Sequence, residues 1–124
     1  MPQSRVAAIP SAIYTALLAG VYATPAIHAS VTGVFTSTVP TDAYRGAGRP
    51  EACFVLERLA DEAARLLGID RAEIRRRNLV PPSAMPYKTP IGPTYDCGDF
   101  PRIFARALAL ADYDRFDERR ATAS

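Results

Sequence analysis

Lysine, histidine and cysteine are scarce in this chain of 124 residues, which has one lysine, one histidine and two cysteines. Cys53 and Cys97 form no C-x-x-C pair, which excludes a disulfide framework and is typical of reduced thiols in a cytoplasmic protein. A formal net charge of +2 is too small to predict a nucleic-acid partner. His28, the single histidine, gives no basis for a serine–histidine–aspartate triad.

From Val6 to Thr41 there is no aspartate, glutamate, lysine or arginine, so the stretch is uncharged unless His28 is protonated. A membrane-spanning helix needs about 20 predominantly apolar residues, and prolines interrupt this stretch at Pro10, Pro25 and Pro40. An export signal is the other alternative, but a single basic residue precedes the apolar run and Pro10 breaks it. We therefore expect no membrane contact. We expect burial of the stretch within a larger body, and poor solubility when it is exposed.

Hydrophobic periodicity predicts an α+β fold class, with one or two strands followed by three helices and a long proline-rich loop. A short helix is expected over Ser11–Ala19, with Ser11 as its N-cap and Gly20 as its stop. The alternation in AIHASVTGVF predicts a half-buried strand over Ala26–Phe35. The three later helices are expected from Pro50 to Gly68, over Arg71–Arg77 and over Phe100–Asp112; the loop is Pro81–Asp99, and the polar tail after Arg115 is expected to fray.

The helix that begins at Pro50 carries an apolar stripe with helical spacing, expected to face inward: Ala52, Leu56, Leu59, Ala60, Ala63, Leu66 and Leu67. In the Phe100–Asp112 helix, the inward residues are expected to be Ile103, Phe104, Ala107, Leu108 and Ala111. Asp70 is predicted to cap the middle helix in a capping box with Glu73.

The most informative stretch for function is Tyr44-Arg45-Gly46-Ala47-Gly48, directly before the predicted long helix. Glycines let a backbone approach a ligand closely, and free N–H groups at a helix N-terminus favour an anion. The flanking Arg45 and Arg49 offer charge-assisted hydrogen bonds. A plain glycine turn into a capped helix explains the same spacing. The stretch is neither a P-loop nor a dinucleotide fingerprint, because it lacks the Gly-Lys-Ser/Thr and the third glycine.

Longer motifs go beyond this pattern: AYRGAGRPE (Ala43–Glu51), RRRNL (Arg75–Leu79), TPIG (Thr89–Gly92) and YDCGD (Tyr95–Asp99). The chain from Ile9 to about Phe116 resembles the molybdenum-binding large subunit of the xanthine dehydrogenase and aldehyde oxidase family. Within that family it is most similar to large-subunit homologues of aerobic carbon monoxide dehydrogenase. The resemblance implies that residues 1–124 form a partial molybdopterin-binding domain, an internal fragment of a much longer subunit.

The resemblance also implies cofactors and partners. Family members hold molybdenum on a molybdopterin, with the cytosine dinucleotide form expected here, and oxidise a small-molecule substrate with water as the oxygen donor. The expected partners are the remainder of the large subunit and the subunits that carry [2Fe-2S] clusters and FAD. Two cysteines could not hold such clusters in this chain.

Residue by residue, the resemblance makes Tyr44, Arg45, Gly46 and Gly48 the cofactor-binding loop and Ala47 a substrate-binding position. Gly46 stands where carbon monoxide dehydrogenases carry a copper-binding cysteine, which argues against that substrate. Ala47 stands where purine hydroxylases carry a stacking aromatic residue, so an aldehyde or another N-heterocycle is expected. No catalytic residue and no metal ligand is assigned to this chain, which is expected to be inactive alone. The alternative is a non-catalytic helical interaction module derived from the same fold.

Overall fold

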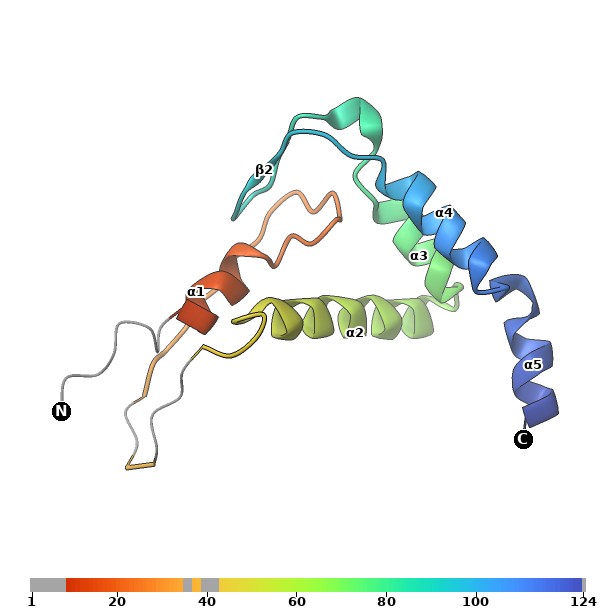
Figure 1. Cartoon of the computed structure of the whole chain (residues 1–124), viewed down its shortest axis with the longest axis horizontal. Coiled ribbons are helices and arrows are strands. Elements are labelled where there is room, and N and C mark those ends of the chain that lie inside the picture. The colour runs from red at the N-terminus through yellow and green to blue at the C-terminus, as the bar shows by residue number, and fades with distance from the viewer. Residues whose placement is uncertain (1–8, 35–36, 39–42, 124) are drawn as a thin grey trace.

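The computed structural model describes residues 9–34, 37–38 and 43–123 (Figure 1). The elements, in chain order, are α1 (Ile9–Ala16), α2 (Arg49–Leu67), α3 (Arg71–Asn78), a 3₁₀ turn η2 (Pro82–Ala84), β1 (Tyr87–Lys88), β2 (Thr94–Tyr95), α4 (Phe100–Leu110), a second 3₁₀ turn η3 (Tyr113–Arg115) and α5 (Phe116–Ala123). In Figure 1 the long helix α2 runs along the base of an open arch. Helix α1 and the β1–β2 hairpin lie toward one end of α2, and α3 and α4 lie toward the other. The α+β class is confirmed.

Helix α2 begins and ends at glycines in the left-handed conformation, which few other residues adopt without strain. Gly48 has φ 96° and Gly68 has φ 65°, and the Gly68 amide donates to the Ala64 carbonyl. Pro50 lies in the first turn, where a missing N–H costs nothing, and Glu51 favours the positive end of the helix. The predicted bounds are therefore confirmed to within one residue.

Helix α1 begins earlier than predicted, because Pro10 occupies its first turn as Pro50 does in α2. Ser11 consequently lies inside the helix, and its prediction as the N-cap was wrong. The helix ends at Ala16, and turns follow as far as Val21. Gly20 has the predicted left-handed conformation, with φ 54°.

The strand predicted over Ala26–Phe35 is wrong for the described part, residues 26–34, which has no regular structure. His28, Ser30 and Thr32 are exposed and Ile27 and Ala29 are half-buried, so the pattern of burial holds through Ala29. A strand also needs a neighbour that completes its hydrogen bonds. Among the described residues no backbone bonds to residues 26–34. Phe35 lies outside the described residues.

The loop predicted over Pro81–Asp99 contains short elements instead of being irregular throughout. β1 and β2 pair antiparallel, with Tyr87 opposite Tyr95 and Lys88 opposite Thr94, so the strands follow the first three α-helices instead of preceding them. The Tyr87 and Tyr95 rings stack, with centroids 6.3 Å apart. This cross-strand pair favours the hairpin. The tail is also more ordered than predicted, because α5 follows η3.

The inward stripe predicted for α2 and α4 is correct in part. Ala52 and Ala64 of α2 are buried, but Leu59 and Leu66 are 62% and 70% exposed, and Ile103 of α4 is 64% exposed. The described elements therefore leave most of the surface of these side chains uncovered. No helix in the described part is long and apolar enough to cross a membrane.

The core is small and sits where α2, α3 and the segment after α3 meet. Its buried apolar members are Ala19, Ala52, Ala64, Ala72, Ile74, Leu79 and Val80. Asp70 caps α3 as predicted, accepting from the amides of Ala72 and Glu73 at 2.8 and 2.9 Å. The capping box is not formed, because the Glu73 carboxylate pairs with Arg76 and Arg77 instead.

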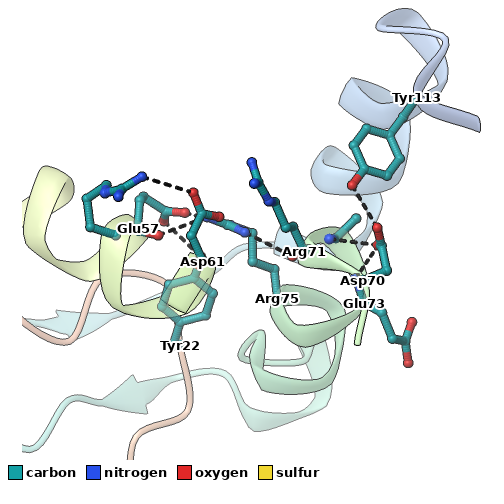
Figure 2. A network of polar contacts seen from close by, with 10 residues as sticks. Tyr22, Glu57, Asp61, Asp70, Arg71, Glu73, Arg75 and Tyr113 are labelled. Atoms are coloured by element: carbon teal, nitrogen blue, oxygen red, sulfur yellow. Dashed lines mark hydrogen bonds and ion pairs between the residues drawn. The ribbon is translucent and has the colours of Figure 1, made fainter. Parts of the chain in front are cut away.

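A polar cluster joins α2 and α3 across this core (Figure 2). Arg75 of α3 donates from Nε to Glu57 at 2.6 Å and from Nη2 to Asp61 at 3.0 Å, both carboxylates being on α2. The backbone between α1 and residue 26 lies beside the end of α3, with the Ala23 amide 2.8 Å from the Asn78 carbonyl. The Tyr95 hydroxyl donates to the Gly20 carbonyl, so the hairpin is attached to the same segment.

Candidate functional site

The predicted loop Tyr44–Gly48 forms two overlapping turns that lead into α2. The Ala47 amide donates to the Tyr44 carbonyl at 2.8 Å, and the Arg49 amide donates to the Gly46 carbonyl at 2.9 Å. Three successive residues have positive φ: 91° at Gly46, 44° at Ala47 and 96° at Gly48. Alanine rarely adopts this conformation, and such strain is held only where the surrounding structure imposes it.

Close packing requires glycine at both glycine positions of the loop. A Cβ on Gly46 would lie 2.7 Å from the Pro50 ring, and a Cβ on Gly48 would lie 2.1 Å from the Pro10 carbonyl oxygen of α1. Gly48 is buried. The glycine before the helix therefore brings the loop backbone against α1 in addition to capping α2.

Several loop amides lack an acceptor in the described structure. Among the described residues, no carbonyl or side chain accepts from the amides of Arg45, Gly46, Gly48 or Glu51. Helix N-terminal amides lack partners within their own helix, and the helix dipole adds positive potential at that end. This donor set suits an oxygen atom that carries negative charge.

An open pocket of about 380 Å³ lies beside the loop. Gly48 and Glu51 form one wall, α1 contributes Pro10, Ser11 and Tyr14, and the irregular segment contributes Ser30, Val31 and Thr32. Two residues with unpaired amides thus border a concavity. Residues 30–32 carry no sequence pattern that indicates a pocket, because their alternation is typical of a strand.

The loop side chains have different surroundings. The Arg49 guanidinium donates to the Gly46 carbonyl at 3.3 Å, so it supports the turn itself. Tyr44 is 87% exposed and Arg45 is exposed. Ala47 is half-buried. The structure therefore brings the five predicted residues together at one corner, with Tyr44 and Arg45 directed to solvent.

The donor chemistry of this corner fits an oxo-bearing cofactor that brings its own metal ligands. In the described part of the chain, no group of three or more histidine, cysteine or acidic side chains is placed to hold a metal ion. Main-chain amides and arginine side chains can bind the oxygen atoms of such a cofactor but cannot ligate its metal.

Comparison with known proteins identifies the family of most of this chain. Residues 3–79, more than half of the chain, match the family described as the molybdopterin cofactor-binding domain. The match includes α1, the Tyr44–Gly48 loop, α2 and α3.

Individual relatives extend the match beyond α3. The carbon monoxide dehydrogenase large chain of Hydrogenophaga pseudoflava is 36% identical over 107 residues, 85% of this chain and 13% of that protein. Two proteins of Paenarthrobacter nicotinovorans are each 34% identical. The 6-hydroxypseudooxynicotine dehydrogenase complex subunit gamma aligns over 87% of this chain and 14% of its own length. The nicotine 6-hydroxylase large subunit aligns over 82% and 12%.

The chain thus spans between 12 and 14% of the length of these relatives. The relatives are subunits of oxidoreductase complexes by name, and the family resemblance carried by AYRGAGRPE and the later motifs is confirmed. The chain belongs to the molybdopterin cofactor-binding domain family.

Proposed function

We propose that this chain supplies the cofactor-side loop of a molybdenum hydroxylase large subunit. In this proposal residues 1–124 form part of a molybdopterin-binding domain, and the remainder of the large subunit completes the cofactor site. The observation that carries the proposal is the loop before α2, whose amides at Gly46 and Gly48 have no acceptor among the described residues.

The loop residues act through their backbone in this proposal. The amides of Arg45, Gly46 and Gly48 donate to oxygen atoms on the cofactor, and the positive end of α2 adds to the favourable potential. Arg49 holds the turn by its hydrogen bond to the Gly46 carbonyl. When bound, the molybdenum–molybdopterin supplies the redox chemistry that incorporates an oxygen atom from water into the substrate. We assign it the cytosine dinucleotide form.

The substrate we propose is an aldehyde or an N-heterocycle. Two of the relatives act, by name, on nicotine and on 6-hydroxypseudooxynicotine. Ala47 provides only a methyl group at the substrate-side position, which leaves room for a larger molecule than a stacking aromatic residue would. Gly46 offers no thiol for a copper ion, so we do not propose carbon monoxide as the substrate.

This chain has only two cysteines, too few to hold iron–sulfur clusters itself, so in this proposal the electrons leave through other polypeptide. We propose subunits that carry [2Fe-2S] clusters and FAD, in keeping with relatives named as a large chain and a large subunit. We also propose a cytoplasmic location. Cys53 and Cys97 are both free thiols, which suits a reducing compartment.

A chimera tests the proposal directly. The matched segment of the Hydrogenophaga pseudoflava large chain would be replaced by this chain and expressed with its partner subunits. We expect stoichiometric molybdenum by mass spectrometry and a pterin by fluorescence after oxidation. Arg45→Ala should keep this loading, since the donor is its main chain. Gly48→Ala should lower the affinity for the cofactor about tenfold by displacing unpaired donors.

The molybdenum and pterin content of the chimera, of its variants and of the isolated chain can each contradict the proposal. A folded chimera without molybdenum and pterin would overturn the proposal. Full loading of the Gly48→Ala variant would show that the position of the loop backbone at Gly48 does not matter for cofactor binding, which would contradict the role proposed for it. The isolated chain is expected to bind neither molybdenum nor pterin, because most of the pocket belongs to other polypeptide.

A second candidate function is a non-catalytic helical interaction module. The observation that favours it is the exposure of large apolar side chains on two helices, Leu59 and Leu66 on α2 and Ile103 and Leu110 on α4. Exposed apolar surface of this kind is typical of an interface. A loaded chimera would exclude this reading, since it predicts no cofactor.

A further inference from the structure

Helix α1 is held at both ends by backbone atoms that approach it closely. At its last residue, the carbonyl oxygen of Ala16 faces Gly92 in the turn of the hairpin, where a Cβ would lie only 2.0 Å away. Gly92 has no left-handed conformation that would otherwise require glycine. The requirement at position 92 is therefore steric, and it comes from α1.

The other end of α1 meets the loop in the same way. A Cβ on Gly48 would lie 2.1 Å from the Pro10 carbonyl oxygen and 2.9 Å from the Tyr14 nitrogen. Pro10 and Ala16 are six residues apart, about 9 Å along the helix. The short helix thus separates the hairpin turn from the candidate loop, and Figure 1 shows the hairpin reaching toward α1.

The hairpin turn is well suited to hold a fixed position. The buried Thr89 hydroxyl donates to the Pro93 carbonyl at 2.8 Å and accepts from the Gly92 amide at 3.0 Å. The Thr89 amide also donates to the Pro93 carbonyl, at 3.3 Å. These bonds close the turn around Gly92, and the Tyr95 hydroxyl attaches the second strand to the Gly20 carbonyl.

We propose that Gly92 is a positioning residue for the candidate loop, acting through α1. The hairpin turn fixes the C-terminal end of α1, and α1 in turn fixes the backbone at Gly48 and one wall of the pocket. A side chain at position 92 would push α1 away from the hairpin and toward Gly48. The effect of Gly92 on cofactor binding rests on the proposed function. The effect of Gly92 on the position of Gly48 does not.

Nuclear magnetic resonance of the ¹⁵N-labelled chain, without cofactor, tests the coupling. Gly92→Ala is expected to shift the amide resonances of Gly48 and Glu51, which are far from position 92 in the sequence. Gly33→Ala is the matched control, because its added methyl group meets nothing within 4 Å. It should leave the resonances of Gly48 and Glu51 in place.

A second pair of variants decides the matter if Gly92→Ala does not fold. Thr89→Val removes the hydroxyl that closes the turn without adding an atom at position 92, and Thr89→Ser keeps the hydroxyl. Thr89→Val should shift the Gly48 and Glu51 amides, and Thr89→Ser should restore them. Shifts confined to the hairpin and Ala16 in every folded variant would overturn the proposal.

These results separate the two proposals. A chimera without molybdenum would leave the coupling between Gly92 and Gly48 intact, because the resonances are measured without cofactor. Conversely, unshifted Gly48 and Glu51 amides would refute the positioning role while the loaded chimera still supported the proposed function.

Discussion

The Tyr22 hydroxyl donates a hydrogen bond of 2.8 Å to Oε1 of Glu57, a residue 35 positions later in the chain. Oε2 of the same carboxylate accepts from Arg75 at 2.6 Å (Figure 2). One side chain of α2 thus connects the segment after α1 with α3. Burial and, to a smaller extent, the hydrogen bond to Glu57 together raise the pKa of Tyr22 from 10.0 to about 12.

The raised pKa of Tyr22 predicts a loss of stability in alkali. The folded-state pKa lies above the unfolded value, so the stabilisation is complete below pH 10.0 and is lost as the pH rises toward about 12. Tyr22→Phe should lower the free energy of unfolding by about 1 kcal/mol at neutral pH, and the variant should lose less stability over the alkaline range. Urea unfolding at a series of pH values measures both effects. Equal alkaline loss in both proteins would contradict the prediction.

Arg75 is expected to be the most sensitive arginine in the described part of the chain. Its side chain is 15% exposed and contacts Glu57 and Asp61. It also donates to the Glu57 carbonyl at 3.1 Å. Lysine cannot reproduce this planar set of donors, so Arg75→Lys should cost about 1–3 kcal/mol of unfolding free energy.

The matched control for Arg75 is its neighbour Arg76. Arg76 is 54% exposed and pairs with Glu73 on the surface of the same helix. Exposed pairs contribute little, so Arg76→Lys should change the free energy of unfolding by less than about 0.5 kcal/mol. Equal losses in the two variants, measured by urea unfolding, would refute the special role of Arg75.

The features that the sequence predicted well are those fixed by local chemistry. Helix α2 is bounded by glycines whose lack of a side chain permits a left-handed cap, and Asp70 caps α3 through its own carboxylate. Such signals act over a few residues and need no tertiary neighbour. The glycine loop Gly46–Gly48 was recognised for the same reason, from its spacing relative to Pro50.

The features that the sequence missed depend on distant neighbours. Alternation over residues 26–34 predicted a strand, but a strand forms only beside a partner, and none is hydrogen-bonded to that segment in the described structure. The requirement for glycine at position 92 comes from the Ala16 carbonyl, in a helix far away in the sequence. No local pattern indicates such a contact. Periodicity likewise predicted that Leu59 faces inward, but periodicity cannot show which element would cover it, and Leu59 is exposed among the described residues.

Gly48 and Gly68 offer a comparison between strain and steric clash. Both have positive φ, but a Cβ at Gly68 meets nothing within 4 Å while one at Gly48 meets α1. Gly68→Ala should therefore cost only the left-handed strain, about 1–2 kcal/mol. Gly48→Ala adds a backbone clash and should cost about 1–3 kcal/mol more. Differential scanning calorimetry or urea unfolding measures the loss of unfolding free energy in each variant. Equal losses would contradict the prediction, because they would mean that the Pro10 carbonyl lies farther from Gly48 than the structure shows.

The exposed leucines of α2 make the final prediction. Leu59 and Leu66 are 62% and 70% exposed, so the fold gains little from their burial, whereas Leu56 is half-buried against the segment at Gly20. The double variant Leu59→Gln with Leu66→Gln should change the free energy of unfolding by less than about 1 kcal/mol, in line with exposed positions. The same substitution at Leu56 should cost about 2 kcal/mol or more of unfolding free energy, because it removes partly buried apolar surface and buries an amide.

Light scattering should show less self-association for the Leu59→Gln, Leu66→Gln double variant, since exposed apolar surface drives association. A double variant as unstable as Leu56→Gln would mean that the two leucines are buried in the chain as it exists in solution, and the interaction-module reading would then lose its support.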